Sequence, residues 1–311
     1  MKVLVAGATG AIGRPLVAAL VEAGHEVLAL TRNAGVRVPG ATTVVADVLD
    51  RDGLLRAVGG LRADALIHEL TALAKTPARY ADMAMTNTLR TTGTAHLLKA
   101  ARAVGARRFV TQSMVPGYGF LDHGVRPLTE EDPFGQARGA RTDPVVAAMR
   151  ATERQAFEAD GIDGVALRYG AFYGLTASRS FVEALRSGRL PVPRDGGRTM
   201  AWIHLADAAS ATVAALEKGA AGQAYNIVDD TPVTWGEMFR EHARAAGVRP
   251  PRALPDRVIR LAAPYFAALM VDTSMRVSNA KAKAELGWTP ALPGYRDGVR
   301  RDLTSRTTPA G

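Results

Sequence analysis

Short, continuous apolar runs alternate along the chain with longer stretches in which apolar residues recur every three or four positions. Residues 3–6 form the first such run, and further short strands are predicted over residues 26–30, 42–46, 63–67 and 108–113. A continuous apolar run predicts a strand buried on both faces, as in parallel sheets, and the longer period predicts amphipathic helices. The alternation therefore predicts an α/β fold with a doubly wound, Rossmann-like parallel sheet.

Three glycines follow the first run at three-residue spacing, and a helical pattern begins at Ile12. Gly7 permits a tight turn, Gly10 lets a pyrophosphate approach the backbone, and Gly13 lets the helix pack closely on the strand. The helix N-terminus then faces the anion. We predict that this turn binds a dinucleotide; the alternative is a glycine-rich turn without a ligand. The predicted contacts are Gly7, Thr9, Gly10, Ala11, Ile12 and Gly13.

The second strand ends beside Arg32. An NAD-preferring site usually has an acidic residue here, which accepts a hydrogen bond from the ribose 2′-hydroxyl, whereas an arginine pairs with a 2′-phosphate. We therefore predict NADP(H) in preference to NAD(H). The alternative is that Arg32 is an ordinary surface residue.

The glycine spacing resembles that of the short-chain dehydrogenase/reductase superfamily, in particular its extended and atypical, epimerase/dehydratase-like branch. Residues 200–209 resemble its Ile-His-Val-x-Asp-x-Ala signature, and residues 281–288 resemble its closing Lys-x-x-x-Glu-Leu-Gly-Trp motif. The resemblance spans nearly the whole chain. It implies a dinucleotide-binding domain over residues 1–168 and a small C-terminal α/β substrate lobe over 169–311, interleaved as one structural unit.

The resemblance also implies roles for individual positions. Asp47, which is alternatively a helix cap, matches the residue that hydrogen-bonds the adenine amine, and Ser113 falls where the catalytic serine is expected. Further cofactor contacts are expected at Val48, Leu70, Thr71 and Asn87. Substrate contacts are expected at Ser113, Met114, Tyr169 and Tyr173.

The family's proton relay is missing. Its Tyr-x-x-x-Lys pair uses a tyrosine whose pKa the lysine lowers. Counting back from Glu153 places Val145 and Met149 at these two positions, and the sequence has no other Tyr-x-x-x-Lys. Either other groups supply the proton, or the substrate needs little acid help (a conjugated enone, a quinone, an iminium), or the protein binds NADP(H) as a sensor.

Several side chains are candidates for replacing the missing pair. Tyr118 and Tyr173 are our first predictions for the proton source. Glu69 departs from the family pattern and is a candidate general base or substrate anchor, because burying a carboxylate without a role is costly; the alternative is that it points to solvent. Other candidates are Tyr169 and His204. The predicted catalytic residues are thus Ser113, Tyr118, Tyr173 and Glu69.

The composition limits the kinds of binding partner that we expect. The chain has 311 residues, a net charge of +9 and no cysteine. The charges are scattered, so we expect no nucleic-acid partner, and without cysteine no thiolate metal site or thiol nucleophile exists. No apolar run approaches a membrane span, so we expect a cytoplasmic protein without a membrane partner. We expect a small-molecule substrate and no metal, and a homodimer is possible.

Together these patterns predict an atypical NADP(H)-dependent oxidoreductase that acts on a carbonyl or conjugated alkene of a small organic metabolite. The alternatives are a non-redox epimerase, dehydratase or cyclase on the same fold, and a catalytically silent NADP-binding regulatory protein.

Overall fold

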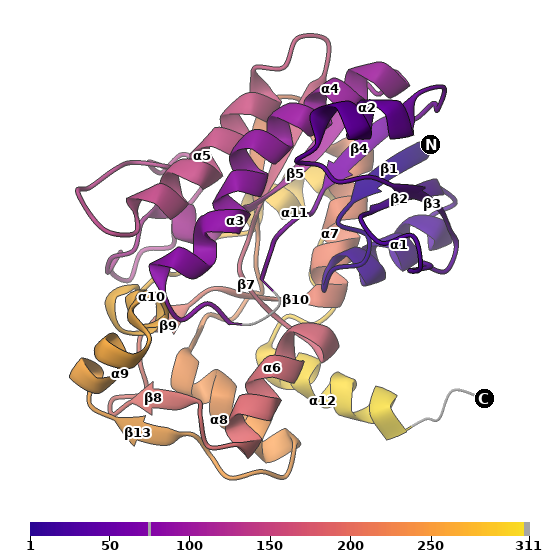
Figure 1. Cartoon of the computed structure of the whole chain (residues 1–311). Helices are drawn as coiled ribbons and strands as arrows, with labels where there is room; N and C mark the ends of the chain where they lie inside the picture. Colours follow the sequence, from indigo (N-terminus) through magenta and orange to yellow (C-terminus); the bar gives the residue numbers. More distant parts are fainter. Residues whose placement is uncertain (74–75, 308–311) are drawn as a thin grey trace.

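The structure is a computed structural model that describes residues 1–73 and 76–307. Its centre is a seven-stranded parallel sheet in the order β11-β6-β5-β4-β1-β2-β3 (Figure 1). The strands are β1 (Lys2–Ala6), β2 (Glu26–Thr31), β3 (Ala41–Val45), β4 (Ala65–His68), β5 (Arg108–Met114), β6 (Asp163–Tyr169) and β11 (Gln223–Ile227). The predicted Rossmann-like sheet is confirmed.

The strand order reverses beside β1, which pairs with β2 on one side and with β4 on the other. Open parallel sheets bind ligands in the crevice at the carboxyl ends of their strands, where the order reverses. The turn after β1 and the end of β4 both lie at this point. The fold therefore places the glycine turn where a ligand is expected.

Helices cover both faces of the sheet (Figure 1). One layer contains α1 (Gly13–Glu22), α7 (Leu205–Lys218) and α11 (Ala280–Leu286), and the other contains α2 (Arg51–Val58), α4 (Thr94–Val104) and α5 (Asp143–Phe157). Val3 and Val5 pack toward the first layer, and Leu4 and Ala6 pack toward the second. Burial on both faces explains the continuous apolar run of β1.

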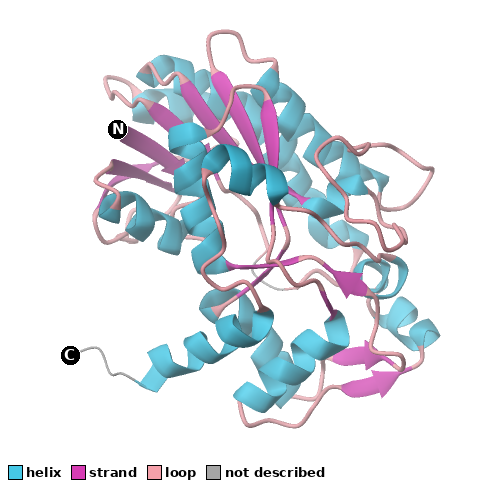
Figure 2. Cartoon of the chain, turned by 180° about the vertical axis from the view of Figure 1, so that it is seen from behind, coloured by secondary structure: helices cyan, strands magenta, loops and turns pink. Residues whose placement is uncertain are grey.

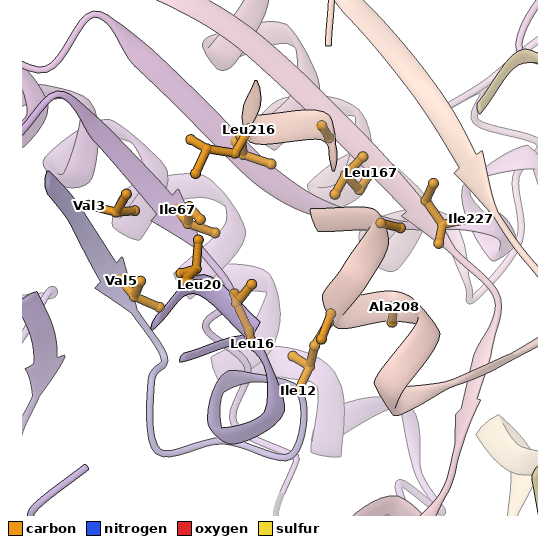
Figure 3. Packing of buried hydrophobic residues seen from close by; sticks show 14 of the residues in the cluster. Val3, Val5, Ile12, Leu16, Leu20, Ile67, Leu167, Ala208, Leu216 and Ile227 are labelled. Atoms are coloured by element: carbon orange, nitrogen blue, oxygen red, sulfur yellow. The ribbon is translucent and has the colours of Figure 1, made fainter. Parts of the chain in front are cut away.

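Figure 3 shows the packing beneath the first layer. Leu16 and Leu20 of α1, with Ala208 and Leu216 of α7, belong to one buried cluster with Ile67 of β4. α7 and β11 lie beyond residue 168 in the sequence, yet they complete the sheet and one of its covering layers. The two lobes are therefore interleaved along the chain.

The smaller lobe lies below the sheet layers in Figure 2. Its strand pairs are β7 (Ala171–Tyr173) with β10 (Trp202–His204), β9 (Thr199–Met200) with β12 (Val233–Thr234), and β8 (Pro191–Pro193) with β13 (Arg252–Leu254). Its helices are α6 (Leu175–Arg186), α8 (Trp235–Ala245), α9 (Asp256–Ala262), α10 (Pro264–Ala267) and α12 (Tyr295–Thr307). Trp202, Trp235, Phe239 and Phe266 form an aromatic core in this lobe.

The helical segment over residues 80–104 is not uniform. It begins as the 3-10 turn η1 (Tyr80–Met83), continues as α3 (Ala84–Thr88), widens into the π-helical turn η2 (Leu89–Gly93) and ends as α4. A π turn inserts one residue into the helical ladder and shifts which side chains face the core, and such turns are frequent at functional sites.

The helical segment over residues 256–272 is also interrupted. Ala263 has φ −143° and ψ 69°, outside the helical region. Pro264 follows it, and a proline disfavours helical geometry in the residue before it. The chain resumes as α10 and continues into the π-helical turn η4 (Ala268–Asp272). None of the helices in the described ranges is long and apolar enough to cross a membrane.

Candidate active site

A cavity of about 990 Å³ runs along the carboxyl ends of the sheet strands and into the smaller lobe. The glycine turn and Arg32 line one part of it, and Phe172 and Trp235 line another. Ligand pockets of about 300–1,000 Å³ are typical of small-molecule sites, and this cavity is at the upper end of that range. It joins the expected cofactor site and the smaller lobe in one space.

Backbone contacts require the glycines of the turn. Gly7 has a φ of +98°, and a Cβ there would lie 2.7 Å from the carbonyl oxygen of Glu69. A Cβ on Gly13 would lie 2.0 Å from the carbonyl oxygen of Gly7. No side chain caps the N-terminus of α1, so its first amides are not satisfied by a capping side chain. This cradle fits a dinucleotide pyrophosphate.

The predicted cofactor residues lie mostly around the cavity. Those that line it are Gly7, Thr9, Gly10, Ala11, Ile12, Arg32, Asp47, Val48, Leu70 and Thr71. Gly13 is buried beneath the turn, where it packs the helix on the strand. Asp47 accepts a hydrogen bond from the Leu49 amide, and its side chain still borders the cavity. Asn87 is not among the lining residues in the described part of the chain.

Glu69 is 3% exposed and borders the cavity at the end of β4. The Tyr169 hydroxyl donates to Glu69 Oε1 at 3.0 Å and lies 2.6 Å from Thr212 Oγ1, which donates to the Ala208 carbonyl at 2.7 Å. Glu69 Oε2 is buried and has no hydrogen-bond partner among the described residues.

The electrostatics agree with this arrangement. Burial raises the pKa of Glu69 to about 8, and burial beside Glu69 raises the pKa of Tyr169 well above its usual value. Both groups are therefore neutral at pH 7. Tyr169 is fully buried and does not itself line the cavity among the described residues, so it supports Glu69 instead of contacting a substrate.

Ser113 does not line the cavity in the described part of the chain. It is fully buried and its Oγ has no hydrogen-bond partner among the described residues, whereas its neighbours Gln112 and Met114 both line the cavity. Successive side chains on a strand point to opposite faces. The predicted substrate contact at Met114 therefore borders the cavity, and the Ser113 hydroxyl points away from it.

Tyr118 lies in a buried hydrogen-bond network. It follows β5 in the 3-10 turn η3 (Val115–Tyr118), and its hydroxyl donates to Asn226 Oδ1 and accepts from Arg168. Arg168 in turn makes two bonds to the buried carboxylate of Glu153. Burial raises the pKa of Tyr118 to about 12. Its hydroxyl is held inside a closed network and is not available to a substrate in the cavity.

Tyr173 lies in the core of the smaller lobe. It is fully buried and donates to Asp229 Oδ2 at 2.7 Å, and burial with the neighbouring Asp229 raises its pKa. Burial also raises the pKa of Asp229 to about 8. His204, a further candidate, accepts from the Ala206 amide and so caps α7. These groups stabilise the smaller lobe and do not line the cavity within the described residues.

An apolar cluster lies where the proton relay was expected. Met149 lines the cavity and packs with Val145, Met83 and Tyr265, and Met114 packs against them. Thioether and aliphatic side chains neither donate nor accept a proton, so the two positions of the expected pair, Val145 and Met149, offer shape and polarizability and no acid–base chemistry. Tyr265 carries the one hydroxyl of the four clustered side chains, and burial raises its pKa to about 12.

The sequence prediction missed Arg90. It is 3% exposed and lines the cavity from η2, on the helical segment where Asn87 was expected to act. Thr86, Arg90 and Thr94 recur at four-residue spacing and all three are buried. Because this spacing places them on one helix face, the helical period could have predicted that Arg90 faces inward. Aromatic residues of the smaller lobe were also missed, because their pocket forms only when the lobe folds back. They are Phe172, Phe181, Trp202, Trp235 and Phe266.

The parallel sheet, the glycine cradle at its switch point and the joined cavity define a nucleotide-binding enzyme of the Rossmann class. Residues 3–228 match the family model described as "NAD dependent epimerase/dehydratase family". The chain belongs to this family, and it is an NAD(P)-dependent enzyme of the oxidoreductase and epimerase kind.

The chain is similar to two reductases over most of its length. It is 40% identical to "3-diazoavenalumate denitrifying reductase" of a Streptomyces species, over 97% of this chain and 100% of the relative. It is 30% identical to "2-alkyl-3-oxoalkanoate reductase" of Stenotrophomonas maltophilia strain K279a, over 79% of this chain and 76% of the relative.

Solved structures share the fold. The UDP-glucose 4-epimerase of Thermus thermophilus, in complex with NAD, has a TM-score of 0.80 and 25% identity, over 100% of this chain and 100% of the other. A human epimerase family protein with NADPH has a TM-score of 0.77 and 23% identity, over 98% of this chain and 99% of the other. The fold itself is thus found with either nicotinamide dinucleotide.

Proposed function

We propose that this chain is an NADP(H)-dependent reductase that adds a hydride to a small electrophilic metabolite without proton transfer from a side chain. One observation carries the proposal: Met149, at the position of the family's lysine, lines the cavity, and Val145, at the position of its tyrosine, packs in the same apolar cluster. The Ser113 hydroxyl is buried, and the Tyr118 hydroxyl donates to Asn226. The substrate therefore needs to be one that requires little acid assistance.

The residues around the cavity suit the parts of such a cofactor. The glycine turn and the amides at the start of α1 would hold the pyrophosphate, and Asp47 would bind the adenine. Arg32 would pair with the 2′-phosphate from the end of β2, where an NAD-binding site would usually have an acidic residue. Arg32 and Arg14 both line this part of the cavity and add positive charge to it.

Replacement of Arg32 tests the cofactor preference. In Arg32→Ala, NADPH affinity is expected to fall at least about tenfold, because a charge-assisted contact to the 2′-phosphate is lost, while NADH affinity stays within about twofold. Calorimetric titration with both nucleotides measures the two affinities. If the ratio of NADPH affinity to NADH affinity were unchanged, Arg32 would not be a residue that binds the 2′-phosphate.

Two observations point to the class of compound that would accept the hydride. They are the absence of the Tyr-x-x-x-Lys pair and the name of the relative that is 40% identical. Reduction of a carbonyl creates an oxyanion, which a tyrosine usually protonates. When a hydride from the reduced nicotinamide replaces an aromatic diazonium group, the hydride pair forms the C–H bond and the C–N pair leaves with dinitrogen. No proton is needed at the carbon in this case. The similarity to a reductase named for denitrifying a diazo carboxylate makes an aromatic diazo compound our first candidate.

Single-turnover reduction tests the reaction. With C4-deuterated NADPH and a diazotised aminocinnamate, the product is expected to carry one deuterium at the carbon that lost nitrogen, as measured by mass spectrometry. The rate constant is expected to stay within about threefold as the pH rises through the Glu69 pKa of about 8. If Glu69 were the acid, the rate would fall above that pH, because only its protonated form donates.

Two outcomes would contradict the proposal. A rate that falls as Glu69 ionises would identify a proton donor after all. Normal NADPH binding with no deuterium transfer to the diazo compound, a quinone or an enone would instead favour epimerase-like chemistry without net reduction.

A further inference from the structure

Arg90 is a buried cation for which the structure shows no charge partner. Its side chain makes no hydrogen bond or ion pair with the described residues, and its Nε and Nη1 are buried without any acceptor. The side chain reaches the cavity from the π-helical turn η2. An ionised group held this way is costly in a folded protein, so an arginine without a partner at a cavity wall indicates a ligand that completes it.

No neighbouring group in the described ranges supplies the missing negative charge. Tyr265 interacts with Arg90, and burial raises the Tyr265 pKa to about 12, so this hydroxyl is neutral. His68 also interacts with Arg90, and burial lowers the His68 pKa to about 4, so it is neutral as well. Glu69, the nearby cavity acid, is protonated at pH 7. Burial lowers the pKa of Arg90 only to about 10, which leaves it cationic.

Building on the proposed function, we propose that Arg90 binds the carboxylate of an aromatic substrate. A guanidinium presents paired N–H donors in a plane that matches the two oxygens of a carboxylate. Tyr265, which interacts with Arg90, packs with Met83 and Met149 in the apolar cluster of the cavity wall. Trp235 and Phe266 line the same cavity and offer flat apolar surfaces to an aromatic body.

The cofactor phosphates would be held by other groups. The pyrophosphate cradle lies after β1 and Arg32 lies after β2, whereas Arg90 comes from η2 on the opposite helical layer and packs near the methionine cluster. The arginine therefore remains available to a second anion when a dinucleotide is present. Under this assignment, Arg32 would bind the cofactor and Arg90 would bind the substrate.

Binding of a non-reacting pair of probes tests the assignment. trans-Cinnamate and cinnamamide have nearly the same shape and differ in charge, and each is titrated calorimetrically into the protein saturated with NADP⁺, which has no hydride to give. The wild type is expected to bind cinnamate at least about tenfold more tightly than cinnamamide. Arg90→Met is expected to bring this ratio to about one, and Arg90→Lys to leave an intermediate ratio.

Four controls accompany the binding experiment. Arg56→Met, at an exposed position on α2, is expected to keep the wild-type ratio. NADP⁺ affinity is expected to stay within about threefold in Arg90→Met, and its melting temperature to be no lower than that of the wild type, since the variant removes an unpaired buried charge. NADP⁺ binding by the wild type checks the proposed function separately from the probe ratio.

The proposal is overturned by either of two results. One is a wild type that binds cinnamate no better than cinnamamide. The other is an Arg90→Met protein that keeps the wild-type ratio while losing NADP⁺ affinity, which would make Arg90 a cofactor residue. Deuterium transfer from NADPH can succeed in both cases, so the reductase proposal is judged independently.

Discussion

A Gly13→Ala variant is expected to bind NADPH at least about 100-fold more weakly than the wild type. The added Cβ would lie 2.0 Å from the carbonyl oxygen of Gly7 and 2.8 Å from two backbone atoms of Ala8. All of these atoms belong to the turn itself, so relief requires the turn to open or α1 to move away from β1. Either change displaces the amides that would hold the pyrophosphate.

Gly93→Ala is the matched control for Gly13→Ala. Gly93 is also buried in a helical segment, but a Cβ there would meet nothing closer than a Val48 methyl group at 3.5 Å. Its NADPH affinity is expected to stay within about threefold of the wild type. Fluorescence titration of NADPH measures both variants, and a Gly13→Ala protein that binds as tightly as Gly93→Ala would disprove the role given to the cradle.

An Arg168→Met variant is expected to lose about 3–5 kcal/mol of stability, because it leaves a buried charge without its partner. Arg168 Nε lies 3.0 Å from Glu153 Oε1, and Arg168 Nη2 lies 2.8 Å from Glu153 Oε2, with both side chains at least nine-tenths buried. The guanidinium also donates to the Tyr118 hydroxyl and lies 3.8 Å from the centre of the Phe134 ring. One substitution therefore removes the support of three groups.

Arg154→Met is the control on the same helix as Glu153. Arg154 faces Glu158 at 3.9 Å on the surface, and its side chain is 62% exposed. Exposed pairs of this kind contribute little, so its stability is expected to stay within about 0.5 kcal/mol of the wild type. Urea unfolding compares the two variants, and a loss below about 1 kcal/mol in Arg168→Met would contradict the account of the network.

The contacts of the Tyr118 hydroxyl indicate a structural role for this residue. The hydroxyl links Arg168 to Asn226 of β11, so it joins the end of one sheet strand to the next. Sequence alone favoured a proton donor at this position because a tyrosine follows the expected serine. Its two partners lie 50 and 108 residues away along the chain, and no local pattern indicates them.

The sequence by itself determined the sheet, the glycine turn and the family. These features rest on local rules: apolar run length, helical period and the spacing of three glycines within seven residues. Residues 3–6 are apolar on both faces because β1 is buried on both faces, and Gly7 and Gly13 are required by contacts within their own turn. Rules of this kind need only residues that are close together in the sequence, so no tertiary contact has to be known to apply them.

Only the tertiary structure decided which side chains face the cavity. Ser113 and Met114 are adjacent, yet a strand directs them to opposite faces, so a one-residue difference in alignment exchanges a buried hydroxyl for a cavity thioether. Arg90 became a candidate site residue because it is buried at the cavity wall with no counter-charge among the described residues. Side-chain direction and missing partners depend on segments distant in sequence, and for that reason the chemistry of this cavity emerged only from the folded chain.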